Sequence, residues 1–314
     1  MIVREGESRI EVWAPAKLNL SLEVLARRDD GFHEIETLMV PISLWDTVEF
    51  WASPTPEPLD RGLPTQDNRT LRFVVRRGKD SRGAQATPEE IPEGADNLVV
   101  RAVELLRRRA GIETGGTIRL TKRIPLAAGL GGGSSDAAAA LAAANLGWRV
   151  GYSPARLAAL AAELGSDIPF FFACSPAICR GRGERVEPID RLGPLHFVVV
   201  HPPEGLSTAD VYRHCQAASR PREVAPLVDA LRVANLGRAG RLLVNRLQAP
   251  AARLSSSILQ LKEEFTKHGF LGHQLSGSGT SYFGLSPTAR HARRAAARLN
   301  ARGLGRTYAV RTCP

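Results

Sequence analysis

Residues 126–140 read LAAGLGGGSSDAAAA: four glycines within five positions, then two serines, an aspartate and a run of alanines. Glycine allows positive φ and a close approach by a ligand, because it has no Cβ. The alanines that follow are strong helix formers, and Gly147 provides a C-terminal stop. Ser134 and Ser135 are favourable N-cap residues. The stretch therefore predicts a helix that begins inside or just after a glycine loop.

The segment before this loop predicts a strand, because residues 116–124 alternate apolar and polar side chains. The first N–H groups of a helix lack intrahelical partners and carry the positive end of its dipole, so they favour a phosphate. No Gly-Lys-Ser/Thr follows at P-loop spacing, and no acidic residue follows at dinucleotide-fold spacing. The pattern indicates a different phosphate cradle. The alternative is a flexible loop before a small-residue helix packed close to a sheet.

The composition is that of a globular protein: 314 residues, 43% hydrophobic and 24% charged. This length predicts two domains. The longest apolar stretch, 168–179, is too short to span a bilayer, and the charged N-terminal segment does not resemble a signal peptide, so we expect no membrane partner. The four cysteines have no CxxC spacing. They favour thiols in a reducing cytoplasm over a disulfide framework or a zinc site.

The net charge of +10 raises the hypothesis of nucleic-acid binding. The arginines, however, are scattered over predicted helix faces at 103–111 and 289–303, where a solvated surface explains them. We therefore expect no nucleic-acid partner, although the positive surplus would attract an anionic small molecule. Only five of the 42 basic residues are lysine, and two of them, Lys17 and Lys122, lie beside the motifs described here.

Strand-like and helix-like segments alternate in both halves of the chain, which predicts mixed α+β layers. The predicted helices cover 96–111, 153–165, 207–216, 225–247, 255–269 and 287–302. The predicted strands lie in 9–25, 36–51 (a strand pair), 116–124, 195–203, 270–286 (strand, glycine turn, strand) and 306–313. Two proline-rich polar segments, 52–70 and 77–95, predict loops or insertions.

Three isolated polar residues are candidates for chemistry. Lys17 and Asn19 share one face of a predicted strand, because strand side chains alternate with period two. Asp167 follows a predicted helix and precedes Pro169 and three phenylalanines. A carboxylate against so much apolar surface is costly unless it is paired or functional, and a general base for a hydroxyl is one such function. The alternatives are an edge strand with polar side chains outward and an Asx turn before proline.

A second glycine-rich segment, LSGSGTSYFGL at 275–285, is either a hairpin or a further nest of backbone N–H groups that closes over a phosphate or substrate. Aromatic residues supply another candidate site. Phe32 and His33 follow a glycine turn, and Tyr212 lies on a predicted helix. Two aromatic faces can hold a base between them by stacking, whereas a core-anchoring role is the ordinary alternative for Phe32.

Taken in order, the segments PAKLNL, DGFHEIETL, GLGGGSSDAAAA, GSDIPFF and LSGSGTSYFGL resemble the GHMP kinase superfamily over nearly the whole chain. This resemblance implies a two-domain α+β fold, 1–185 and 186–314, with the active site in the inter-domain cleft. It implies ATP and Mg²⁺ as cofactors in a cytoplasmic enzyme that is a monomer or weak homodimer. The DGFH and GLGGGSSD segments resemble the members that phosphorylate the 2-hydroxyl of a cytidine diphosphate-linked methylerythritol. Homoserine, mevalonate and sugar substrates remain alternatives within the superfamily.

The resemblance also implies roles for individual residues. Asp167 matches the general base, and Lys17 matches the lysine that orients it and stabilises developing charge. The implied ATP-binding residues are Gly129, Leu130, Gly131, Gly132, Gly133, Ser134, Ser135 and Lys122. The implied substrate-binding residues are Asn19, Phe32, His33, Thr208 and Tyr212. No metal ligand is identified. Two features depart from the family: the segments 52–70 and 77–95 are long, and Phe32 stands where many members carry tyrosine.

Overall fold

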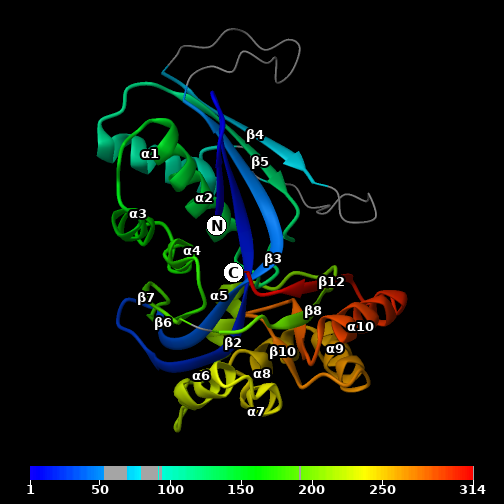
Figure 1. The fold of residues 1–314 in the computed structure, drawn as a ribbon. Helices are drawn as coiled ribbons and strands as arrows, with labels where there is room; N and C mark the ends of the chain where they lie inside the picture. The colour runs from blue at the N-terminus through cyan, green and yellow to red at the C-terminus, as the bar shows by residue number, and fades with distance from the viewer. Residues whose placement is uncertain (53–68, 79–90, 92–93, 191, 314) are drawn as a thin grey trace. The chain divides into compact units, whose positions relative to one another are not determined.

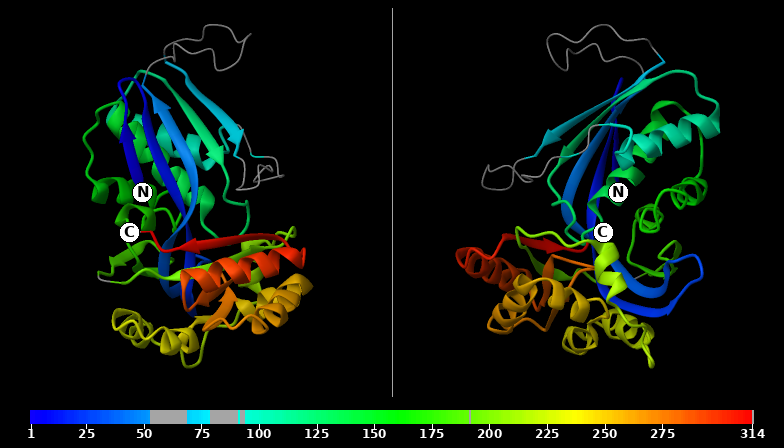
Figure 2. Two further views of the ribbon diagram at one scale, coloured as in Figure 1. Left: turned by 45° about the vertical axis from the view of Figure 1, so that its right-hand side comes forward. Right: turned by 180° about the vertical axis from the view of Figure 1, so that it is seen from behind.

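The computed structural model describes residues 1–52, 69–78, 91, 94–190 and 192–313, so the predicted loops at 52–70 and 77–95 fall mostly outside the described residues. The chain packs as two compact units, drawn in Figures 1 and 2. Unit 1 comprises 1–15, 45–124 and 132–172, and unit 2 comprises 16–44, 125–131 and 173–314. Each unit is therefore built from segments far apart in the sequence. The boundary near residue 185 between the two domains expected from the sequence stays a prediction.

Unit 1 has strands covered by helices. Its strands are β1 (Ile2–Glu5), the first part of β2 (Ile10–Arg27), the last part of β3 (His33–Trp51), β4 (Leu71–Arg77) and β5 (Gly116–Lys122). β5 pairs antiparallel with β3 and parallel with β4. The helices are α1 (Leu98–Ala110), α2 (Gly132–Gly147), α3 (Pro154–Ala161) and, at the border of the unit, α4 (Phe170–Ala173). α1 and α2 pack side by side (Figure 1).

The predicted helix boundaries in unit 1 are mostly confirmed. Asn97 caps α1, because its side chain accepts a hydrogen bond from the Val99 N–H at 2.9 Å, and Gly111 ends the helix at φ 66°. Ser153 caps α3. α2 begins inside the glycine loop, as predicted. The prediction of Ser134 and Ser135 as N-caps is wrong, since the helix already begins at Gly132 and both serines lie within its first turn.

One of the two long strands differs from expectation, and the other agrees with one of the two alternatives for 9–25, a single strand or two. The predicted pair in 36–51 is one continuous strand, β3, and β2 is likewise a single strand of 18 residues. β3 needs no turn because different partners pair with its two ends: residues 35–39 with β6 (Ala177–Gly181) and residues 47–51 with β5. Continuous backbone pairing keeps the strand extended through Pro41.

Unit 2 contains the rest of β2 and β3 and a separate four-stranded antiparallel sheet of order β10-β11-β8-β12. The remaining strands are β7 (Arg185–Pro188), β8 (His196–His201), β9 (Val244–Asn245), β10 (Gly272–Leu275), β11 (Tyr282–Ser286) and β12 (Arg306–Arg311). The helices are α5 (Thr208–Arg213), α6 (Ala225–Arg232), α7 (Leu236–Leu242), α8 (Gln248–Leu254), α9 (Ser256–Thr266) and α10 (Ala289–Ala301). Of these, β7, β9 and α8 were not predicted.

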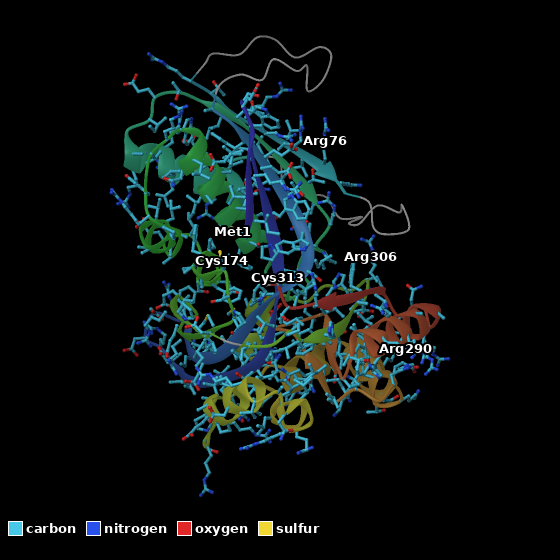
Figure 3. All side chains as sticks on the ribbon, viewed as in Figure 1. Met1, Arg76, Cys174, Arg290, Arg306 and Cys313 are labelled. Carbon is cyan, nitrogen blue, oxygen red and sulfur yellow. The ribbon has the colours of Figure 1, made fainter. Side chains whose placement is uncertain are left out.

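The four-stranded sheet carries the main core of unit 2. α10 packs against β8, β11 and β12 (Figure 2), and its alanines alternate with exposed arginines such as Arg290 (Figure 3). Buried apolar side chains from the sheet and its helices fill the interior, including Val198, Val200, Phe265 and Tyr282. Each such side chain stabilises the fold by about 1.5–3 kcal/mol. Within the described part of the chain, no helix has the length and apolar character needed to cross a membrane.

Candidate active site

In unit 2, the glycine loop (129–135) begins in direct contact with the second glycine turn (276–279). Gly129 has φ +72°, and a Cβ there would lie 2.1 Å from the Ser276 carbonyl oxygen. The Ser276 hydroxyl donates to the Gly129 carbonyl at 3.0 Å. Only glycine allows this approach, because any side chain at residue 129 would overlap the second turn.

Lys17, on β2, contacts both glycine segments. Its backbone N–H donates to the Leu130 carbonyl at 2.9 Å. Its ammonium, on a side chain only 4% exposed, donates to Asn19 Oδ1 at 2.5 Å. A Cβ on Gly277 would lie 3.3 Å from both Lys17 Nζ and Asn19 Oδ1. The structure thus brings together Lys17, Asn19, the start of the glycine loop and the second glycine turn.

The orientation of the Asn19 side chain is set by its neighbours. Asn19 Nδ2 donates to Thr37 Oγ1 at 2.8 Å, while the Thr37 hydroxyl donates to the Ser21 carbonyl at 2.6 Å. The Thr37 oxygen is therefore an acceptor toward Asn19, which leaves Asn19 Oδ1 as the acceptor toward Lys17. Gln274 Nε2 also donates to the Asn19 carbonyl at 3.0 Å. The Lys17–Asn19 pair is thus held within a satisfied buried network.

Asn245, on β9, supports the second glycine turn and was not predicted. Its amide nitrogen donates to the carbonyls of Leu275 at 2.9 Å and Gly277 at 2.8 Å. Its amide oxygen accepts from the Leu247 N–H at 2.9 Å. The one or two helices predicted over 225–247 included Asn245, so nothing local in the sequence marked it as a support for a turn thirty residues later.

The predicted substrate residues on α5 lie beside this turn. The Thr208 and Ser278 hydroxyl oxygens are 2.9 Å apart. Tyr212 lies four residues after Thr208, and its ring centroid is 5.1 Å from that of His33, with 32° between the ring planes. Burial and the charge of Arg27 lower the pKa of His33, which favours a neutral imidazole at pH 7. The structure therefore places Thr208 at the second glycine turn and brings the rings of His33 and Tyr212 together.

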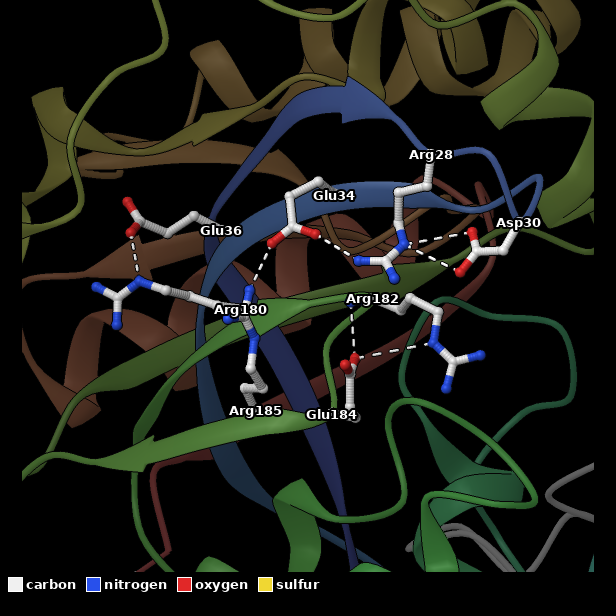
Figure 4. A network of polar contacts seen from close by, with 8 residues as sticks. All are labelled: Arg28, Asp30, Glu34, Glu36, Arg180, Arg182, Glu184 and Arg185. Carbon is white, nitrogen blue, oxygen red and sulfur yellow. Dashed lines mark hydrogen bonds and ion pairs between the residues drawn. The ribbon is translucent and has the colours of Figure 1, made fainter.

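Phe32 lies on the turn between β2 and β3 and is 52% exposed, so it does not anchor a core. The Asp30 carboxylate accepts the Phe32 N–H at 3.1 Å and a bond from Arg28 Nε at 3.1 Å. Arg28 also pairs with Glu34 at 2.7 Å (Figure 4). The Arg182 guanidinium lies 4.9 Å from the Phe32 ring centroid, within range of a cation–π interaction. An ion-pair network thus holds the turn that presents Phe32.

In unit 1, the rest of the glycine loop forms the first turn of α2. Gly133 is exposed, and no atom lies within 4 Å of the position of a Cβ on it. Ser134 is half-buried, whereas Ser135 is fully buried and its hydroxyl has no hydrogen-bond partner among the described residues. The exposed backbone at Gly133 is thus open to a ligand on its outer side.

Lys122, at the end of β5, is enclosed beneath this turn. Its ammonium pairs with Asp46 and with Asp136, the latter at 2.8 Å, and the side chain is 1% exposed. Burial alone would lower the pKa of Lys122, but the charges of Asp136 and Asp46 raise it above its ordinary value. The sequence analysis did not predict this ion pair. The one signal for it in the sequence is the position of Asp136 directly after the loop serines. The predicted contact of Lys122 with ATP stays a prediction.

Asp167 lies in unit 1, half-buried, in the turn before α4. The phenylalanines that follow it serve the core: Phe170 and Phe171 are buried, with ring centroids 5.1 Å apart. They anchor the turn that presents the carboxylate. The pairing of Asp167 with Lys17 stays a prediction.

Comparison with known proteins shows the family to which the chain belongs. The family model for the N-terminal domain of GHMP kinases matches residues 97–174, and the model for their C-terminal domain matches residues 227–304. Solved structures of more distant proteins share the fold. A homoserine kinase from Cytophaga hutchinsonii is 21% identical with a TM-score of 0.71, and the match covers 100% of this chain and 97% of that one. The two family matches identify the chain as a small-molecule kinase of the GHMP superfamily, which confirms the predicted fold class.

More similar relatives show which family of the superfamily the chain belongs to. A protein of Pelotomaculum thermopropionicum named 4-diphosphocytidyl-2-C-methyl-D-erythritol kinase is 40% identical over 291 residues, which covers 92% of this chain and 93% of the relative. A crystal structure of 4-(cytidine 5'-diphospho)-2C-methyl-D-erythritol kinase is 34% identical with a TM-score of 0.76, covering 97% of this chain and 100% of that one. The chain belongs to the family of 4-diphosphocytidyl-2-C-methyl-D-erythritol kinases.

Proposed function

We propose that the chain transfers the γ-phosphoryl group of ATP to the 2-hydroxyl of 4-diphosphocytidyl-2-C-methyl-D-erythritol, a step in the non-mevalonate route to isoprenoid precursors. The observation that supports the proposal is the convergence of Lys17 with both glycine segments in unit 2. Its backbone N–H donates to Leu130 in the glycine loop, and its buried ammonium lies beside Gly277 in the second glycine turn. Such a site suits a substrate whose reacting part is a chain of phosphates.

The proposed mechanism uses two side chains. Asp167 accepts the proton of the 2-hydroxyl as its oxygen attacks the γ-phosphorus. The new oxygen–phosphorus bond forms, the bond between the γ-phosphorus and the β,γ-bridging oxygen breaks, and ADP leaves. Lys17 offsets the negative charge on the reacting oxygens. The acceptor is a tertiary alcohol, a weak nucleophile that needs both a base and positioning.

ATP would be held by the glycine loop, with the N–H groups of the first turn of α2 directed at its phosphates. Mg²⁺ keeps several water ligands and is bound largely by nucleotide phosphates, so it needs few protein ligands. Among the described residues, no three His, Cys, Asp or Glu side chains form a cluster that could hold a metal ion. When bound, Mg²⁺ would neutralise charge on the phosphates.

The cytidine part of the substrate would lie against the aromatic residues. Phe32 presents an exposed ring, and the neighbouring rings of His33 and Tyr212 supply a second aromatic surface. Stacking on such rings is worth about 1–3 kcal/mol per base. A neutral His33 has one donor and one acceptor nitrogen to offer to the base edge. Thr208 and Asn19 would contact the substrate nearer the second glycine turn and Lys17.

A substrate panel tests the proposal. ADP release is measured in a coupled assay with ATP and, in separate reactions, the cytidine-linked alcohol, homoserine, mevalonate and galactose. We expect turnover with the cytidine-linked alcohol and only background with the others. Preferred turnover of homoserine, mevalonate or galactose would assign the chain to another GHMP activity.

We further propose that the enzyme works in the cytoplasm as a monomer or weak homodimer without a nucleic-acid partner. Sedimentation at micromolar concentration tests the oligomeric state, and a salt titration of binding to DNA and RNA tests the last point. Nucleic-acid binding through the basic surface would weaken steeply with salt, and submicromolar binding at physiological salt would contradict the proposal.

A further inference from the structure

Three ionisable side chains form an enclosed cluster beneath the first turn of α2. Asp46 comes from β3, Lys122 from β5 and Asp136 from α2, and they are 0%, 1% and 2% exposed. The Lys122 ammonium donates to one oxygen of each carboxylate. We call this set the Lys122 cluster. It joins the helix to two strands of unit 1.

The Lys122 cluster also holds the chain that leaves β5 toward the glycine loop. The second oxygen of Asp46 accepts the N–H groups of Arg123 and Ile124, the latter at 2.9 Å. Asp46 therefore accepts from three donors, one side-chain ammonium and two backbone N–H groups. Asp136 is different: its Oδ1 atom has no hydrogen-bond partner among the described residues. Burial, and then the charge of Asp46, raise the pKa of Asp136 well above its ordinary value.

Gly132, the first residue of α2, lies directly against the cluster. A Cβ on Gly132 would be 2.8 Å from Lys122 Nζ and 2.9 Å from Ile124 Cγ2. A positive charge at a helix N-terminus is unfavourable, so Lys122 is tolerated there only because two carboxylates surround it. Apolar residues of similar volume would often stabilise a fold as well as such buried charges do. Buried charge pairs are directional, so they fix how the helix and the two strands pack against each other better than apolar contacts do.

We propose that Lys122 is a positioning residue that, with Asp46 and Asp136, sets the first turn of α2 at one distance from β5 and so places the phosphate-binding N–H groups. Lys122 acts from beneath the turn and makes no contact with ATP. This inference rests on the proposed function, because it assumes that the glycine loop binds ATP. It differs from the contact role expected for Lys122 from the sequence.

The test compares Lys122→Met, Asp136→Ala and the conservative Asp136→Asn, whose side-chain oxygen can still accept from Lys122. Glu49→Ala is the matched control, since Glu49 forms a buried ion pair with Arg119 across the same two strands, at 3.3 Å. For each variant, calorimetric titration gives the Kd for ATP with Mg²⁺, thermal unfolding gives Tm, and steady-state kinetics give the KM for the alcohol.

We expect Lys122→Met and Asp136→Ala to raise the Kd for ATP about tenfold, because small displacements of positioned groups have effects of at least this size. Asp136→Asn should bind ATP nearly as the wild type does. The KM for the alcohol should stay within about twofold, because its contacts lie elsewhere. Glu49→Ala should lower Tm without changing the Kd for ATP.

Two results would overturn the inference. If Lys122→Met and Asp136→Ala lower Tm but bind ATP normally, the cluster only stabilises the fold. If Lys122→Met weakens ATP binding while Asp136→Ala does not, Lys122 contacts the nucleotide directly. If Lys122→Met does not fold, the two Asp136 variants are sufficient. Weaker ATP binding in Asp136→Ala but not in Asp136→Asn supports the inference, and normal ATP binding in both contradicts it. Failure of the proposed function is distinct, because the wild-type protein would then not bind ATP or not phosphorylate the alcohol.

Discussion

Gly129 and Gly133 belong to the same loop but have different surroundings. A side chain at Gly129 would overlap the Ser276 carbonyl, whereas Gly133 has open space on its outer side. Glycine at residue 129 is therefore needed for this packing. No packing contact requires glycine at residue 133, and we propose that its role is to let a ligand approach the backbone.

We predict that Gly129→Ala destabilises the protein by more than about 1 kcal/mol, since positive φ alone costs an alanine that much. Gly133→Ala should preserve or slightly raise Tm, because alanine favours a helix, yet it should raise the KM for ATP. Thermal unfolding and kinetics check both. Unchanged ATP kinetics in Gly133→Ala would argue against phosphate binding at this turn.

Asp167 provides the second test at this scale. Asp167→Asn keeps the shape of the side chain but cannot accept a proton, so kcat should fall by about 10²–10⁴-fold with Tm nearly unchanged. Asp229→Asn, on the exposed face of α6, is the matched control and should leave kcat unaffected. Near-normal turnover in Asp167→Asn would remove it as the base. Lys17→Ala should lower kcat in the same way.

Among the elements, the second glycine turn depends on β9 for its position. Asn245 donates to two carbonyls of the turn, and an unsatisfied buried carbonyl costs about 1–3 kcal/mol. Asn245→Ala should therefore lower Tm and also raise the KM for ATP. Asn235→Ala removes the cap of α7 and should lower stability by about 1 kcal/mol without changing that KM. Equal effects of both variants on ATP would contradict a specific role for Asn245.

At the scale of the whole molecule, stability should depend on pH through His201. This residue is buried at the end of β8, and its Nδ1 lies 3.3 Å from the Ser281 hydroxyl. Burial, helped by the charge of Arg306, lowers the pKa of His201 from 6.5 to about 4. The folded protein thus binds fewer protons than the unfolded chain between these values. Stability is complete above about pH 6.5 and decreases as the pH falls toward 4.

His201 alone should account for a loss of about 3 kcal/mol in the unfolding free energy over this window. His201→Gln should flatten the dependence of the unfolding free energy on pH between 4 and 6.5. Urea unfolding at several pH values measures it. Identical slopes for the two proteins would show that other groups control acid stability.

The sequence by itself determined the local features of this protein. The helix that starts inside or just after the glycine loop, a cap at Asp96 or Asn97 and the stop at Gly111 follow from residues only a few positions apart, and the structure shows Asn97 as the cap. The order of motifs was sufficient to indicate the superfamily. These features were predictable because helix starts and ends depend on hydrogen bonds and dihedral angles within one or two turns.

Only the tertiary structure decided which distant residues meet. The contact of Gly129 with Ser276, the support of the second glycine turn by Asn245 and the enclosure of Lys122 by Asp46 join positions 30 to 147 residues apart. The continuity of β3 likewise depended on partners from elsewhere in the chain. The physical reason is that pairing and burial of charge depend on the whole packed chain, whereas a residue type and its near neighbours specify only local conformation.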